Sequence, residues 1–199
     1  MRSIGLPLAR LLFKSGLDRL EGTYRLSIEL PEDTKRKADE TARQAFGLKP
    51  GQTPPEVYTQ EDGLPSPDFG DELYTIEYEA EATSSLVREA FLISLFHFWE
   101  RQSNLWLGVR GATYNHQSTI GWLQTHGYTL DEPTIRRLEL AANCAKHGPG
   151  RACDTLYALD PTFFAPPAIQ SMGSSRNFVQ TTIPMMDSLF SAVRQSGPV

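Results

Sequence analysis

The stretch 85–107 constrains the fold more than any other part of the sequence, because it contains neither glycine nor proline. Between Ala90 and Trp99 its apolar residues cover every side of a helix, which is typical of a helix enclosed by other elements. This run includes His97 and is far shorter than the roughly 20 residues needed to cross a bilayer. We therefore predict a long central helix that ends at Gly108 and no membrane segment.

Periodicity and end signals predict further helices around this one. They place helices at 6–20, 33–46, 116–125, 132–147, 150–159 and 184–195. Alternating apolar residues predict a strand over 23–30, ended by Pro31, while 73–81 is either a strand that pairs with it or the start of a helix. The Pro-rich stretch 49–70 is predicted to be a loop or arm. We expect one domain over 1–199, all-α or mainly α, built as an up-down helical bundle with or without a minor β-hairpin.

Composition excludes several classes of protein. The formal net charge of −5 argues against binding nucleic acid through an overall basic field, although a local basic patch remains open. The only two cysteines, Cys144 and Cys153, make a poor disulfide framework, and Cys144 is expected to be inert packing inside a helix. Basic residues interrupt the apolar N-terminus, so no secretory segment is predicted. A reducing cytoplasm is the expected location.

Polar residues follow one side of two predicted helices. On the central helix, His97, Glu100 and Asn104 continue an apolar stripe that begins at Leu86, and Arg101 lies beside them. The side of the helix 132–147 carries a second set, made of Arg136, Glu139, Asn143 and His147. Buried polar groups need partners, so we expect these two sets to meet or to face one cleft.

The order of these motifs resembles that of prokaryotic HEPN (higher eukaryotes and prokaryotes nucleotide-binding) domains. The similar segments are Phe96-His-Phe-Trp-Glu100-Arg-Gln-Ser-Asn104, Trp122-Leu-Gln-Thr-His-Gly127 and Leu140-Ala-Ala-Asn143-Cys-Ala-Lys-His147-Gly, within about 72–160. The resemblance implies an all-α bundle, commonly a homodimer, that is directed at RNA. Many such proteins are metal-independent endoribonucleases of toxin–antitoxin and phage-defence systems, so the resemblance also implies a cognate antitoxin or another protein partner, and no cofactor or metal.

The resemblance assigns roles to particular residues. His147 would transfer a proton and Asn143 would orient it, while a cation stabilises the charge on the phosphate. The family motif has an arginine immediately before its asparagine, and Ala142 occupies that position here. Arg101, Lys146 or Arg151 would therefore have to supply the cation, and Glu100, Asn104 and His97 would form a supporting polar network.

Other interpretations of the same residues stay open. A histidine in the last turn of a helix is favoured by the helix dipole and needs no catalytic role. The chain could then be a non-catalytic binding or antitoxin-like module, or an interaction protein that uses the arm 49–70. Zinc ligation by Cys144, His147, Cys153 and Asp154 lacks the paired spacing of known zinc sites.

Overall fold

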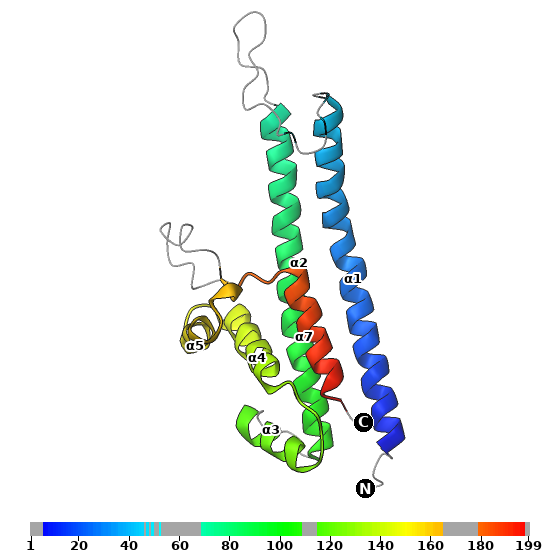
Figure 1. Cartoon of the computed structure of the whole chain (residues 1–199), viewed down its shortest axis with the longest axis vertical. Helices are drawn as coiled ribbons and strands as arrows, with labels where there is room; N and C mark the ends of the chain where they lie inside the picture. The colour runs from blue at the N-terminus through cyan, green and yellow to red at the C-terminus, as the bar shows by residue number, and fades with distance from the viewer. Residues whose placement is uncertain are drawn as a thin grey trace, which may run out of the picture. The chain divides into compact units, whose positions relative to one another are not determined.

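The computed structural model describes residues 6–45, 47, 49, 52, 69–108, 115–164 and 179–197. Its elements are α1 (Leu6–Ala45), α2 (Phe69–Trp106), α3 (His116–Thr125), α4 (Glu132–His147), α5 (Arg151–Leu159), the 3-10 helix η1 (Pro161–Phe163) and α7 (Ile183–Gln195), as Figure 1 shows. The predicted all-α class is confirmed. Within these ranges the β structure is a single antiparallel bridge, which joins Phe164 to Val179.

The predicted strand 23–30 is wrong, because this segment lies inside α1. Tyr24 and Ile28 are buried, whereas Leu26 and Leu30 are 72% and 74% exposed. The buried positions of α1 recur at intervals of three, four or seven residues, which is the spacing of one face of a helix. They are Phe13, Leu17, Tyr24, Ile28, Pro31 and Ala38. The segment 73–81 belongs to α2, which confirms the helical alternative for it and rules out its pairing with 23–30 as a strand.

Pro31 was expected to end an element, yet it lies buried inside α1. A proline inside a helix removes one backbone hydrogen bond and costs about 3 kcal/mol. Polar contacts around the next turn of α1 oppose this cost. Ser84 donates to Glu32 at 2.7 Å, and Lys35 pairs with Glu32 at 3.0 Å and also with Glu81.

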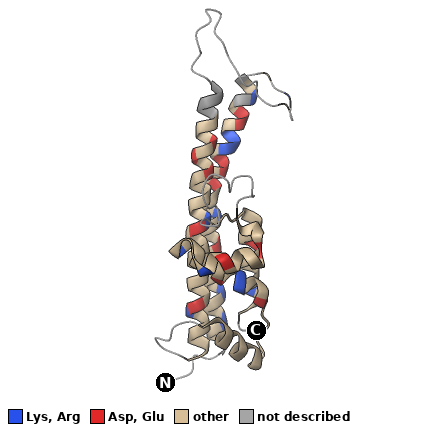
Figure 2. Cartoon of the chain, turned by 90° about the vertical axis from the view of Figure 1, so that its left-hand side faces the viewer, with Lys and Arg blue, Asp and Glu red and all other residues tan. Residues whose placement is uncertain are grey.

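The contacts of the chain divide it into two compact units. Unit 2, residues 25–87, contains the second half of α1 and the first half of α2. Its buried positions include Ile28, Ala38 and Ala80. Acidic and basic residues are interspersed along these helices, as Figure 2 shows, which suits surfaces that face water.

Unit 1 consists of residues 1–24 and 88–199. In it, α4 packs against α5 and α7, and α5 packs against η1. The core is rich in aromatic rings: Trp99 is fully buried, and Tyr24 stacks on Phe190 at 5.6 Å between ring centroids. The helices predicted at 116–125, 132–147, 150–159 and 184–195 are all present, within one residue at each end. Asp131 caps α4 as predicted, by accepting from the backbone N–H of Thr134.

The central helix is present as part of α2, but other elements do not enclose all of it. Its Leu92, Leu95 and Trp99 are buried, whereas Ala90 and His97 are exposed. The sequence did not distinguish the buried face of this helix from its exposed face. The exposed face carries residues that are also common inside proteins, such as Ala90. Leu86, placed at the start of the predicted apolar stripe, is 67% exposed.

Two predictions concern membranes and the arm. None of the described helices combines the length and the apolar character that a membrane span requires. Most of the predicted arm 49–70, including 53–68, lies outside the described residues. At its C-terminal end, Phe69 already belongs to α2.

Candidate functional site

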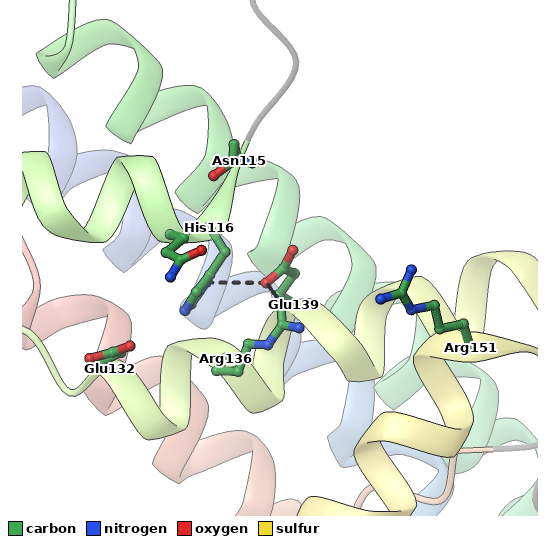
Figure 3. A pocket seen from close by; sticks show the side chains of 7 residues that line it. Asn115, His116, Glu132, Arg136, Glu139 and Arg151 are labelled. Carbon is green, nitrogen blue, oxygen red and sulfur yellow. Dashed lines mark hydrogen bonds and ion pairs between the residues drawn. The ribbon is translucent and has the colours of Figure 1, made fainter.

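A polar cavity lies in unit 1, where residues of α3, α4 and α5 face one another (Figure 3). Its volume is about 610 Å³. We call it the His116 pocket. It is lined by Asn115, His116 and Gln117 from the start of α3, by Glu132, Arg136 and Glu139 from α4, and by Arg151 from α5.

Glu139 is the centre of a polar cluster in this pocket. Its Oε2 lies 3.1 Å from Nδ1 of His116 and 2.5 Å from a guanidinium nitrogen of Arg136. The side chains of His116 and Glu139 are only 11% and 14% exposed, whereas Arg136 is 38% exposed. Figure 3 shows the His116 ring and Arg136 both directed at this carboxylate. Two donors from different helices therefore converge on one acceptor.

Two opposing effects decide the charge of Glu139. Burial alone would raise the pKa of its carboxyl group, but the hydrogen bonds from His116 and Arg136 outweigh burial and hold the pKa below its ordinary value of 4.5. Glu139 is consequently ionised at neutral pH. An ionised carboxylate only accepts hydrogen bonds, so Nδ1 of His116 carries the proton that it donates. In the neutral ring, Nε2 is then the basic nitrogen, and this atom is buried.

Arg151 differs from Arg136 in its partners. Its guanidinium makes no ion pair with the part of the chain that the structure describes, and its side chain is exposed. Figure 3 shows it reaching from α5 toward the Glu139 side of the pocket, while Glu132 lies at the opposite end. A cation that makes no ion pair with a described residue, beside a carboxylate that already has two donors, suits an anionic ligand.

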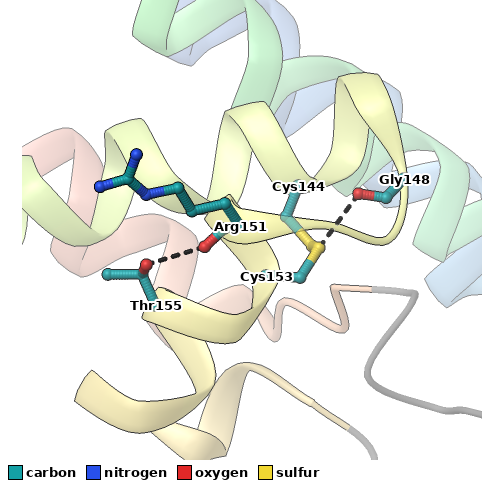
Figure 4. Close-up of a disulfide and its surroundings, with 5 residues drawn as sticks. All are labelled: Cys144, Gly148, Arg151, Cys153 and Thr155. Atoms are coloured by element: carbon teal, nitrogen blue, oxygen red, sulfur yellow. Dashed lines mark hydrogen bonds between the residues drawn. A yellow bond between two sulfur atoms is a disulfide. The ribbon is translucent and has the colours of Figure 1, made fainter.

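A disulfide between Cys144 and Cys153 connects the two helices that carry Glu139 and Arg151 (Figure 4). The sequence suggested a poor disulfide framework and an inert Cys144, and this interpretation is wrong because the two cysteines are bonded to each other. Their Cα atoms are 5.1 Å apart, because the chain reverses between α4 and α5 at Gly148, whose φ is +71°. Disulfides persist in oxidising compartments and are rare in the cytosol, so the cysteines no longer favour a cytoplasmic location.

Of the residues that the HEPN resemblance singled out, Arg151 lines this pocket, but the proposed catalytic pair Asn143 and His147 does not. His147 and Lys146 are exposed at the end of α4, and Asn143 is half-buried; the His116 pocket includes none of them. Among the described residues, His147 makes no side-chain hydrogen bond or ion pair. Ala142 is 2% exposed, so its position is closed to solvent.

The polar residues of α2 do not join this cluster either. His97 pairs with Glu100 of its own helix at 3.2 Å. No hydrogen bond or ion pair within the described ranges links His97, Glu100 or Asn104 to the polar side of α4. Arg101 and His97 instead line a second hollow, together with residues of α1. Of the predicted phosphate-binding residues, Arg101 and Arg151 thus lie in different cavities.

Part of the pocket is evident from the sequence. The shared helix side of Arg136 and Glu139 was visible from their spacing, but His116 was missed. It is the first residue of a ten-residue helix and carries no motif of its own. Only the packing of α3 beside α4 pairs it with Glu139. Among the described residues, no group of three histidine, cysteine or acidic side chains is placed to hold a metal ion.

Comparisons with protein-family models, with characterised proteins and with solved structures find no significant match to this chain. The HEPN resemblance therefore remains a hypothesis.

Proposed function

We propose that this chain is an RNA-directed, HEPN-like helical protein that binds a phosphodiester group in the His116 pocket. The observation that carries this proposal is that Arg151 reaches toward the cluster of Glu139, His116 and Arg136 in the same pocket. The two glutamates that line the pocket formally balance its two arginines, so the net charge of the pocket does not select its ligand. The positions of the individual charges do. Glu139 already accepts from two donors, whereas the guanidinium of Arg151 is available to a phosphate oxygen.

Binding is favoured over cleavage by two further observations. A buried alanine, Ala142, occupies the position where the family motif has its arginine, and His147 lies outside the pocket. The proposal also includes a homodimer and a cognate protein partner. Both rest on the HEPN resemblance alone.

Metal-independent cleavage of RNA is the second candidate, and the contact between His116 and Glu139 favours it. A buried, ionised carboxylate that fixes a histidine is a common way to prepare an acid/base group. In such a reaction the 2′-oxygen forms a bond to phosphorus as the bond from phosphorus to the 5′-oxygen breaks. A basic group accepts the proton of the 2′-hydroxyl, the leaving 5′-oxygen gains a proton, and a cation stabilises the phosphorane-like charge.

Binding is tested with a fluorescently labelled single-stranded RNA in the presence of a chelator, by anisotropy. Arg151→Gln is expected to weaken binding about tenfold, the usual size of one lost charge-assisted hydrogen bond. Arg36→Gln is the control, because it changes the net charge equally and removes an arginine already paired with Asp33 and Glu40. Equal dissociation constants for the wild type and Arg151→Gln would contradict the proposed site.

Cleavage is tested separately, with total RNA and a chelator. If the second candidate holds, wild-type protein produces fragments with 2′,3′-cyclic phosphate ends, His116→Asn abolishes them and His147→Ala retains them. Loss of cleavage in His147→Ala alone would favour the residue that the resemblance indicates. Intact RNA with the wild-type protein would leave the binding module as the function.

A further inference from the structure

A second hollow of about 600 Å³ lies within unit 1, between α1 and α2. We call it the Arg19–Arg101 groove. Its α1 wall consists of Gly16, Arg19, Leu20 and Thr23, and its α2 wall of Ser94, His97, Phe98 and Arg101. Each set follows the spacing i, i+3, i+4 and i+7, which places its members on one face of a helix.

The floor of the groove is apolar and tightly packed. Phe98 is 8% exposed, and its ring centroid lies 5.5 Å from that of Phe13. A Cβ atom added to Gly16 would lie only 2.8 Å from Cε2 of Phe98. Gly16 therefore lets the Phe98 ring approach the backbone of α1, and this contact sets the depth of the groove.

The polar groups that remain available in the groove are cationic. The hydroxyl groups of Thr23 and Ser94 donate to carbonyl oxygens of their own helices, at 2.9 Å and 2.7 Å. Arg19 and Arg101 are exposed, and neither forms an ion pair with a described residue. The lining contains no carboxylate, although Glu100 pairs with His97 from outside the lining.

We propose that the Arg19–Arg101 groove binds the phosphate backbone of single-stranded RNA, as a site separate from the His116 pocket. This inference rests on the proposed RNA-directed function. The seven-residue span of each wall corresponds to about 10 Å along a helix, which exceeds one phosphate group and suits a run of linked phosphates. The arginines lie on opposite walls and contact the charges, while Leu20 and Phe98 lie beneath the sugars.

The groove holds RNA without reading its sequence. Recognition of bases needs hydrogen-bond donors and acceptors aimed at base edges, and the two hydroxyl groups of this groove are already engaged with backbone carbonyls. Contacts to phosphate alone supply affinity that depends on salt and not on sequence. The groove thus increases affinity and orients the strand, and any choice of target comes from another part of the protein.

The test measures RNA affinity over a range of salt concentrations for the full chain. Removing both arginines, with Arg19→Gln plus Arg101→Gln, eliminates two phosphate contacts. The slope of log affinity against log salt should then become shallower by about 1.4, since each contact to a single strand contributes about 0.7. Affinity should fall at least tenfold, and equally for RNAs of different sequence. An unchanged slope overturns the proposal.

Control variants separate this inference from the proposed function. Arg36→Gln plus Arg43→Gln changes the net charge equally in unit 2, where both arginines already have ion pairs, and should leave the slope unchanged. Arg19→Lys plus Arg101→Lys keeps both charges and should retain most of the salt slope. A helical circular dichroism spectrum checks that each variant is folded. If Arg151→Gln binds normally while the Arg19/Arg101 glutamine variant is weakened, the His116 pocket fails and the groove stands.

If Arg151→Gln is weakened while the Arg19/Arg101 glutamine variant binds normally, the groove proposal is wrong and the His116 pocket stands. If the wild type does not bind RNA, both sites are wrong. Vesicles of phosphatidylcholine with phosphatidylglycerol provide the last arm. The wild type could bind these vesicles, and the Arg19/Arg101 glutamine variant could lose that binding while its salt slope for RNA stays unchanged. The groove would then bind lipid phosphates, and the proposal would be wrong.

Discussion

Nδ1 of His116 lies 3.1 Å from Oε2 of Glu139, and this contact joins the first residue of α3 to the middle of α4. Arg136 donates to the same oxygen from one turn earlier on α4. The contact fixes the His116 ring and places it in the wall of the candidate site. Because the Glu139 carboxylate is ionised and largely buried, its contribution to the free energy of unfolding depends on pH.

Replacing Glu139 with glutamine should lower the free energy of unfolding by about 1–3 kcal/mol at neutral pH, because His116 and Arg136 lose an ionised acceptor. The pKa of Glu139 is depressed in the folded state, so its contribution is present above its ordinary pKa of 4.5 and is lost as pH falls through the lowered value. Urea unfolding over this range should therefore show the gap between wild type and variant closing in acid. Glu132→Gln, at the exposed end of the pocket, is the matched control; equal effects of the two substitutions would contradict the special role of Glu139.

In unit 2, Ser84 is fully buried and donates to Glu32. This hydrogen bond is the largest of the causes that lower the pKa of Glu32. Ser84→Ala should destabilise the protein by about 1 kcal/mol and raise the pKa of Glu32, as measured by carboxyl-carbon NMR titration. Ser85→Ala, the same change at the next residue, should alter neither quantity. An unshifted Glu32 titration in Ser84→Ala would show that the hydrogen bond is not made.

Reduction of the Cys144–Cys153 disulfide should lower the free energy of unfolding by about 2–3 kcal/mol, the value expected for a short closed loop. Chemical denaturation with and without a dithiol reductant measures this difference. The variant with serine at both positions should be as stable as the reduced wild type and should not respond to the reductant. Two titratable thiols in protein purified without reductant would mean that the disulfide does not form.

Two glycines of α1 should respond oppositely to alanine. A Cβ at Gly22 meets no atom within 4 Å, so Gly22→Ala should stabilise the helix by about 1 kcal/mol through propensity. At Gly16 the added atom meets the Phe98 ring at 2.8 Å, and the cost of moving that ring should cancel or exceed the gain. Thermal unfolding of the two variants measures the contrast, and a similar gain at both positions would show that α1 and Phe98 are not closely packed.

The sequence predicted the short helices well because their signals are local. A capping aspartate, a first-turn proline and a terminal glycine each act within one turn of the backbone, and α4 begins and ends where these residues stand. The strand prediction over 23–30 failed for the converse reason. Tyr24, Leu26, Ile28 and Leu30 alternate, yet burial selects only the first and third of them, at the spacing of a helix.

The sequence by itself determined that this chain is helical and that Arg136 and Glu139 share a helix face, because both follow from spacing along one element. Only the tertiary structure decided which helix supplies their partner. It brought His116, Arg151 and the two cysteines together from separate elements, and it left His147 at an exposed helix end. Such pairings depend on how helices pack and on where the chain reverses, and no local pattern of residues encodes those distances.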